Sequence, residues 1–301
     1  MFTSNITFNG KDSYDYFSAA LFDNSILQEF EWFDSQQNSL RIPRVTLSGH
    51  TQPGSCSPGA TGSIVLDPAI LNVCAFGIYD VVCRNEVEPT YLSVKLPAGA
   101  NNDVFPNDFA RYVMSELMVQ VGNNMQNVLW IGNSATYSGQ YLGECDGIIT
   151  QALADATVID VAATASTISS ANVQAELARV YSAVPAAVKS SGKPWKIYAS
   201  QDIVDAYLLS QGPSVYGLNV TEPGQLRFAG IPVVVAPFIG TKKMLATWPK
   251  NIVIGTDLRS DMSNIMMLPQ INITGHNKVI IAANWKFGVT YKIGAEIVLY
   301  S

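Results

Sequence analysis

Apolar residues recur three or four positions apart over residues 105–133, and this spacing predicts one long amphipathic helix. At about 1.5 Å per residue such a helix is roughly 35 Å long, so it needs a long sheet or a partner chain beneath its apolar stripe. The predicted stripe consists of Phe109, Tyr112, Val113, Leu117, Val121, Met125, Val128 and Leu129.

Strict alternation of apolar and polar residues predicts a strand near the C-terminus. Its apolar face consists of Trp285, Phe287, Val289, Tyr291 and Ile293. Apolar runs also predict a strand over residues 71–82 that breaks at Gly77, one buried strand over residues 228–236, and two strands around Pro249.

A shorter helical stripe is formed by Val173, Leu177, Val180 and Val184. Ser200 is of the type that caps helices, and it precedes another short helical segment. Helices and strands are mixed without regular alternation, so the predicted fold class is α+β.

Two strand-like runs, residues 40–47 and 63–66, flank a stretch rich in Gly and Pro, which predicts a projecting hairpin. An isolated hairpin is marginally stable in water, so it needs a surface to lie on. The composition of residues 1–36 predicts an N-terminal arm, in which Phe30, Trp32 and Phe33 lie between acidic residues. The arm is too small to bury these rings alone, so either the body of the same chain or a neighbouring chain covers them.

The chain has few charged residues, and this constrains how it is used. Of its 301 residues 48% are hydrophobic and 14% are charged, whereas a typical soluble domain has about 25% charged residues. A chain of this kind buries an unusual share of its surface or gives part of it to other subunits. No apolar run is long enough to span a membrane, and the net charge of −6 argues against dedicated nucleic-acid binding.

Four cysteines, Cys56, Cys74, Cys83 and Cys145, show neither a metal-ligand spacing nor a redox spacing. This pattern predicts reduced thiols in a cytosol.

The sequence contains no convincing catalytic motif. A triad would need His50 or His276 beside a nucleophile and an acid. The spacing of Asp155 and Asp160 does not support a metal site, and the Gly-rich loop at residues 54–59 lacks the lysine that phosphate binding requires. We therefore predict no enzyme, no cofactor and no metal, although a hydrolase with a scattered site remains an alternative.

Four segments, taken in order, carry a resemblance to a known family. Residues 88–99 lead into the long helix, which ends at the segment Leu129–Trp130–Ile131–Gly132–Asn133. Residues 228–234 with 242–255 form an apolar strand pair, and residues 277–291 with 297–299 form closing strands. In this order the chain resembles the major capsid proteins of tailed double-stranded DNA bacteriophages, which have the Hong Kong 97-like fold.

The resemblance implies a domain organisation. It comprises an N-terminal arm (1–36), an extended hairpin loop (37–66), a peripheral domain with a long spine helix (67–150 and 256–290), and an axial domain (151–255 and 291–301). The arm and the hairpin would lie across neighbouring subunits. The assembly contacts expected there are Phe30, Trp32, Phe33, Arg41 and Arg44.

The function implied is structural. The chain would self-assemble through pentamers and hexamers into an icosahedral phage head, as a virion component formed in the host cytoplasm. The head would enclose DNA without sequence-specific binding, with portal and scaffolding proteins, and possible decoration proteins, as partners. An encapsulin-type compartment shell is the alternative within the same fold.

Some members of this family join subunits by an isopeptide bond between a hairpin lysine and an asparagine of a neighbour. Residues 37–66 contain Arg41 and Arg44 but no lysine, and a guanidinium stays protonated at working pH. We therefore predict a non-covalent shell.

Overall fold

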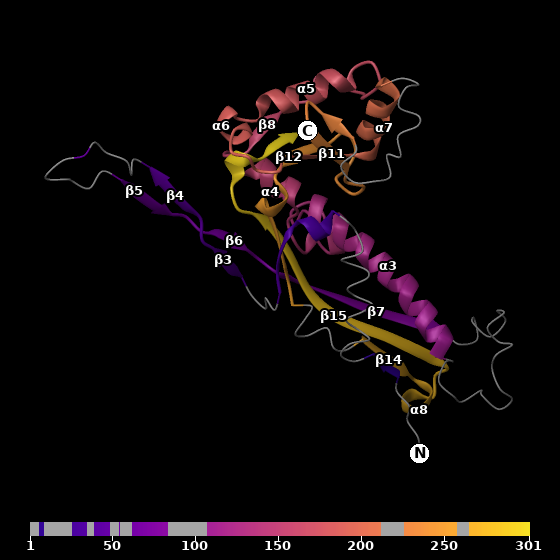
Figure 1. Cartoon of the computed structure of the whole chain (residues 1–301). Coiled ribbons are helices and arrows are strands. Elements are labelled where there is room, and N and C mark those ends of the chain that lie inside the picture. Colours follow the sequence, from indigo (N-terminus) through magenta and orange to yellow (C-terminus); the bar gives the residue numbers. More distant parts are fainter. Residues whose placement is uncertain are drawn as a thin grey trace. The chain divides into compact units, whose positions relative to one another are not determined.

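The computed structural model describes residues 6–8, 26–34, 39–48, 54, 62–83, 107–211, 226–257 and 265–301. The chain divides into two compact units, each with helices and a sheet (Figure 1). The predicted α+β class is therefore confirmed. Unit 1 comprises Met1–Gln37, Val73–Asp146 and Gly255–Gly288, and unit 2 comprises Asn38–Asn72, Gly147–Ile254 and Val289–Ser301.

Unit 1 is built on a sheet with the strand order β1-β14-β15-β13-β2, and β7 also pairs with β15. The strands are β1 (Ile6–Phe8), β2 (Glu31–Phe33), β7 (Cys74–Cys83), β13 (Ile252–Thr256), β14 (Ile265–Pro269) and β15 (Lys278–Tyr291). Helical elements are η1 (Leu27–Glu29), α3 (Asn107–Ile131), η4 (Tyr141–Gly143) and α8 (Ile271–Thr274).

Helix α3 lies along β7 and β15 (Figure 1), and this confirms the long helix that the sequence predicts. Its Met125 sulfur is 3.3 Å from the indole nitrogen of Trp285, and Trp285 stacks on Phe76 with ring centroids 6.2 Å apart. The alternation predicted for the C-terminal strand is confirmed as far as Phe287, since Trp285 and Phe287 are buried and Asn284 is exposed. Beyond it, Gly288 and Thr290 are buried although they lie on the predicted polar face. Ile293 lies beyond the end of that strand.

The buried stripe of α3 differs from the predicted one at its N-terminal half. Tyr112 was expected in the stripe, but 52% of its surface is exposed. Met114 and Met118 are buried instead, in line with Val121 and Met125. Unbranched methionines adapt to the surface of a sheet more easily than an aromatic ring, and this favours the rotated stripe.

Strand β7 runs through Gly77 without the predicted break. Gly77 pairs with Asn284 of β15, and a Cβ atom at Gly77 would lie 2.7 Å from the Asn284 side-chain oxygen. The glycine therefore permits a close cross-strand approach and does not end the strand.

The prediction of reduced thiols is wrong for two of the four cysteines. Cys74, at the start of β7, forms a disulfide with Cys145, which follows η4. The pair is 71 residues apart with a Cα–Cα distance of 5.9 Å. The positions of the two cysteines in the sequence do not predict this pair, because only the fold brings them together. Cys83 is a free thiol, and Cys56 lies outside the described residues.

Unit 2 is built on a second six-stranded sheet with the order β10-β11-β9-β12-β16-β8. Strand β11 runs parallel to β9, and β16 runs parallel to β8, whereas β12 is antiparallel to both of its neighbours. The strands are β8 (Ile159–Val161), β9 (Lys196–Ala199), β10 (Arg227–Phe228), β11 (Ile231–Val235), β12 (Met244–Thr247) and β16 (Val298–Tyr300).

The helices of unit 2 pack on this sheet around one apolar core. The predicted stripe of Val173, Leu177, Val180 and Val184 is confirmed, since all four are buried there. Ser200 precedes α7 as expected, but its hydroxyl makes no capping bond. Helical elements are α4 (Ile148–Ala154), α5 (Val173–Ala183), α6 (Ala186–Lys189), α7 (Gln201–Ser210), η6 (Pro249–Asn251) and η7 (Gly294–Glu296).

The single strand predicted over residues 228–236 is wrong. It is divided by a two-residue turn at Ala229 and Gly230, with φ of 48° and 85°, so that Phe228 pairs with Ile231. Tight hairpin turns need positive φ at both central residues, and alanine gives no sign of this in the sequence. The two strands predicted around Pro249 are confirmed as β12 and β13.

Candidate assembly surfaces

The hairpin that was predicted over residues 37–66 forms, and its paired strands run from Leu40 to Leu71. Its outer part pairs β4 (Val45–Ser48) with β5 (Ser63–Leu66), and its inner part pairs β3 (Leu40–Ile42) with β6 (Ala69–Leu71) (Figure 1). Both strands are interrupted between these parts by a Pro with a charged neighbour. The hairpin is therefore a two-stranded ribbon with a joint.

Strand β5 exposes apolar side chains on both of its faces. Ile64, Val65 and Leu66 are 64%, 52% and 68% exposed, and Ile70 of β6 is 53% exposed. Apolar residues that share one ribbon are typical of a surface that binds another protein. This ribbon is the first candidate assembly surface.

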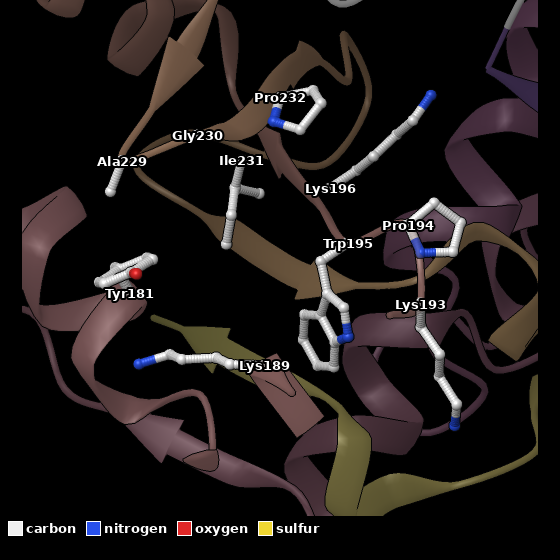
Figure 2. Close-up of a pocket in the computed structure, with 10 residues that line it drawn as sticks. All are labelled: Tyr181, Lys189, Lys193, Pro194, Trp195, Lys196, Ala229, Gly230, Ile231 and Pro232. Carbon is white, nitrogen blue, oxygen red and sulfur yellow. The ribbon is translucent and has the colours of Figure 1, made fainter. Parts of the chain in front are cut away.

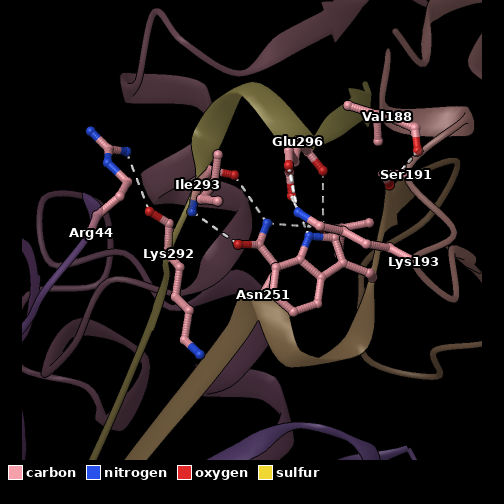
Figure 3. Close-up of polar contacts among 10 residues, drawn as sticks. Arg44, Val188, Ser191, Lys193, Asn251, Lys292, Ile293 and Glu296 are labelled. Carbon is pink, nitrogen blue, oxygen red and sulfur yellow. Dashed lines mark hydrogen bonds and ion pairs between the residues drawn. The ribbon is translucent and has the colours of Figure 1, made fainter. Parts of the chain in front are cut away.

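Arg44 holds the joint of the hairpin in place. Its guanidinium forms an ion pair with Asp67 on the opposite strand, and the backbone N–H of Asp67 donates to the Arg44 carbonyl at 3.0 Å. A second guanidinium nitrogen donates to the Lys292 carbonyl at 3.3 Å, which ties the joint to the C-terminal segment of unit 2 (Figure 3).

A single hydrogen-bonded carboxylate, Asp155, contacts the same C-terminal segment. Asp155 accepts hydrogen bonds from the backbone and hydroxyl of Thr157, both at 2.8 Å, and from the Tyr291 hydroxyl at 2.9 Å. Burial raises the pKa of Asp155, but these hydrogen bonds and the charge of Arg44 outweigh it, so that its pKa lies below the ordinary value. Burial, together with the neighbouring carboxylate, raises the pKa of Tyr291.

A second apolar surface lies on the sheet of unit 1. Cross-strand pairing places Tyr79 of β7 and Met266 of β14 on either side of Ala282 of β15. Tyr79 and Met266 are 70% and 38% exposed. The adjacent row, which is formed by Val81, Ile280 and Leu268, has the same arrangement. Since side chains alternate along a strand, this face is opposite to the one that Trp285 presents to α3.

The five predicted assembly residues have contacts within the chain. Phe30 is buried edge-on against Trp130, with ring centroids 6.2 Å apart. Trp32 donates its indole N–H to the Leu27 carbonyl at 2.8 Å, and Phe33 is half-buried on β2. Arg41 is exposed on β3 beside Ile70, and Arg44 lies at the hairpin joint. Their role between subunits stays a prediction.

The residues that were considered for catalysis are scattered. His276 is exposed in the turn after α8, whereas His50 lies outside the described residues. Within the described ranges, no group of three or more His, Cys, Asp or Glu side chains is arranged to hold a metal ion. Among the described helices, none is long and apolar enough to cross a membrane.

The chain has the fold of solved capsid and virus-like particle structures. One similar structure is the satellite phage P4 procapsid, which includes the size determination (Sid) protein. The alignment covers 95% of this chain and 96% of that one, with a TM-score of 0.59 and 10% identity. The chain aligns over its full length with 93% of a chain of the native GTA particle capsid, with a TM-score of 0.55 and 11% identity.

A virus-like particle from Pyrococcus furiosus is similar at a TM-score of 0.53 and 11% identity, over 95% of this chain and 96% of that one. No protein-family model matches the sequence, and no curated protein matches it. Because the sequence identities are only 10–11%, the similarity concerns the fold. For the fold, it confirms the resemblance of the sequence to phage capsid proteins.

Sequence reasoning missed two features of these surfaces. The hairpin joint depends on Asp67, which lies 23 residues from Arg44, and only the strand register brings the two together. The outer face of the unit 1 sheet was missed because its residues come from three strands that are far apart in sequence. The available signal was the continuous apolar run of residues 279–283, which makes both faces of that strand apolar.

Proposed function

We propose that the chain is the major capsid protein of a tailed double-stranded DNA phage. Identical copies would assemble through pentamers and hexamers into an icosahedral head in the host cytoplasm, with portal and scaffolding proteins as partners. The observation that carries this proposal is the likeness to particle-forming chains over nearly the whole length of both partners. In this assignment the hairpin and α3 correspond to the extended loop and the spine helix.

The exposed surfaces give this proposal a physical mechanism. The β5 ribbon and the outer sheet face of unit 1 both present apolar side chains, and their burial between copies would drive association. Large obligate interfaces are more apolar than ordinary surface, which fits a chain with 14% charged residues. The net charge of −6 fits a shell that encloses DNA without gripping it.

Negative-stain electron microscopy of the purified protein tests assembly directly. We expect closed shells or rings, together with a megadalton species in light scattering. A monomer that stays monodisperse at high concentration with an ordered hairpin would contradict the proposal.

The likeness to the Pyrococcus furiosus particle supports a second candidate, an encapsulin-type compartment shell. The two candidates differ in cargo. Particles isolated from their native source and treated with nuclease should retain protected DNA if the chain forms a phage head. An enclosed enzyme without DNA would favour the compartment.

A further inference from the structure

Unit 2 contains a pocket of about 400 Å³ around Trp195, between α5, α6 and the β10–β11 turn (Figure 2). Two of its lysines are engaged within the chain. The Lys193 ammonium lies 2.6 Å from the carboxylate oxygens of Glu296, and the Lys189 ammonium lies 4.3 Å from the ring centroid of Tyr181. These contacts single out no ligand for the pocket. The chemistry that the proposed function leaves unexplained is the disulfide of unit 1.

The disulfide between Cys74 and Cys145 conflicts with the compartment in which a phage head would be built. Glutathione and thioredoxin keep cytosolic thiols reduced, so structural disulfides are rare there. The folded chain nevertheless brings the two cysteines to a Cα–Cα distance of 5.9 Å, which a disulfide spans without backbone movement. The conflict disappears if the bond closes after assembly, when the particle leaves the reducing cytoplasm.

The site accommodates the reduced state as well as the bonded one. The Cys145 sulfur lies 3.5 Å from the Phe287 carbonyl oxygen, and a thiol at this position can donate its hydrogen to that oxygen. Cys145 is 5% exposed, whereas Cys74 is half-buried at the start of β7. The pair therefore combines a buried thiol that has an acceptor with a more accessible thiol that can react first.

The disulfide lies close to the points where the chain passes between the two units. Cys74 is the second residue of one unit 1 segment, and Cys145 is the last but one of the same segment. Cys74 pairs with Phe287 of β15, which is the last residue but one of another segment. The adjacent Lys286 backbone N–H donates at 2.6 Å to Asp257, the third residue of that segment. Within unit 1, the bond thus joins the segment ends that lead to four of the passages.

We propose that the Cys74–Cys145 bond is a redox lock that closes after the shell has assembled. The proposal rests on the proposed function, because this places assembly in a reducing cytoplasm. While the two thiols are reduced, the segment ends of unit 1 can shift as subunits fit together. Once the bond has formed, these ends are fixed and the shell resists disruption.

A low-molecular-weight disulfide outside the cell is the oxidant in this proposal. The Cys74 thiolate attacks one of its sulfur atoms, which forms a mixed disulfide and releases one small thiolate. The Cys145 thiol then loses its proton and displaces the second small thiolate. Two protein thiols are oxidised, one small disulfide is reduced to two thiols, and these take up the two protons that the cysteines lose.

The state of the cysteines before and after cell lysis tests the timing. Cells that contain assembled particles are quenched with acid, and their protein is alkylated in denaturant so that burial protects no thiol. We expect alkylated Cys74 and Cys145 in the quenched cells. In particles released into buffer with oxidised glutathione, we expect one linked peptide that contains both. Cys83 is the internal control, since it forms no disulfide and should be alkylated in both samples.

Hydrogen exchange of the released particles, with and without reductant, tests the lock itself. Reduction, verified by alkylation, should speed amide exchange next to Cys74, Cys145 and Phe287. Exchange at the other end of the same strand pair, around Val82 and Val279, should stay unchanged. An even loss of protection along both strands, or no loss at all, would show that the bond does not act as a lock.

Two variants separate the bond from other effects of the reductant. Cys74→Ser particles should exchange like reduced wild type even without reductant, whereas Cys83→Ser particles should exchange like oxidised wild type. If Cys74→Ser does not assemble, the comparison of reduced with oxidised wild type still decides the question.

Failure of this proposal differs from failure of the proposed function. A linked peptide that is already present in quenched cells, or none in released particles, would overturn the lock and leave shell assembly standing. Cells that make the protein but contain neither shells nor rings would instead contradict the proposed function, and the lock with it.

Discussion

The disulfide between Cys74 and Cys145 leads to a prediction at the scale of single residues. A bond that closes a loop of 71 residues restricts the unfolded chain, and a loop of this length corresponds to about 4 kcal/mol of stability in the chain-entropy model. Cys74→Ser should therefore lower the unfolding free energy by up to about this amount. Chemical denaturation measures the change.

Cys83→Ser is the matched control, because Cys83 lies at the other end of β7 and forms no disulfide. It should leave stability almost unchanged. Reduction of the wild-type disulfide should lower the unfolding free energy by about as much as the Cys74→Ser substitution does. Alkylation of Cys74 and Cys145 in unreduced, folded protein would contradict the disulfide.

Asp155 should make unit 2 sensitive to acid. Its pKa in the folded protein lies below the ordinary 3.8, so the charged form is favoured by folding. The resulting stability is fully present above this ordinary value, and it is lost as the pH falls through the folded pKa. Asp155→Asn cannot titrate, so its stability deficit relative to wild type should shrink as the pH is lowered from about 5 to about 3.

Urea unfolding at several pH values measures that deficit. Asp160→Asn, which removes an exposed carboxylate from the same unit, serves as the control for the loss of one acidic side chain. If the Asp155→Asn deficit stays constant over this range, the hydrogen bonds from Thr157 and Tyr291 do not stabilise the charged form.

Elements with a regular apolar period were predictable from the sequence. Helix α3, the stripe of α5 and the alternation of β15 follow directly from residue spacing, because one side of each packs on a core. The break at Ala229 and Gly230 was not predictable, since alanine rarely adopts positive φ. The disulfide and the Arg44–Asp67 pair were also missed, because strand register sets these contacts and local sequence does not.

The β5 strand allows assembly and folding to be tested separately. Ile64 and Leu66 are more than 60% exposed, so Ile64→Thr with Leu66→Thr should change the stability of the subunit by less than about 0.5 kcal/mol per site. Each aliphatic side chain fully buried at an interface contributes about 1.5–3 kcal/mol. We therefore expect the double variant to fold but to assemble poorly.

Circular dichroism reports folding of this variant, and light scattering reports assembly. Leu209→Thr is the control, since Leu209 is 60% exposed on α7, outside the hairpin. Normal shells from the Ile64 and Leu66 double variant would exclude the ribbon as an assembly surface.

At the scale of the whole molecule, the α+β class and the capsid-like fold could be predicted, because the order of motifs spans most of the chain. The candidate surfaces could be predicted only in part. A hairpin that needs a surface follows from composition and turn residues. The sheet face of unit 1 and the pocket around Trp195 each combine residues from distant segments, so they become visible only once strand register and packing are known.

The last prediction concerns how the proposed shell is held together. The ribbon from β3 to β6, Leu40–Leu71, contains no lysine, and Arg44 is already paired with Asp67. An isopeptide bond from this hairpin would need an amine that the chain does not supply there. Exposed ion pairs contribute only about 0–1 kcal/mol each, so apolar burial must provide most of the stability. Particles that are boiled and reduced should therefore give one band near 32.5 kDa on a denaturing gel. A ladder of larger species that survives reduction would show that subunits are covalently joined.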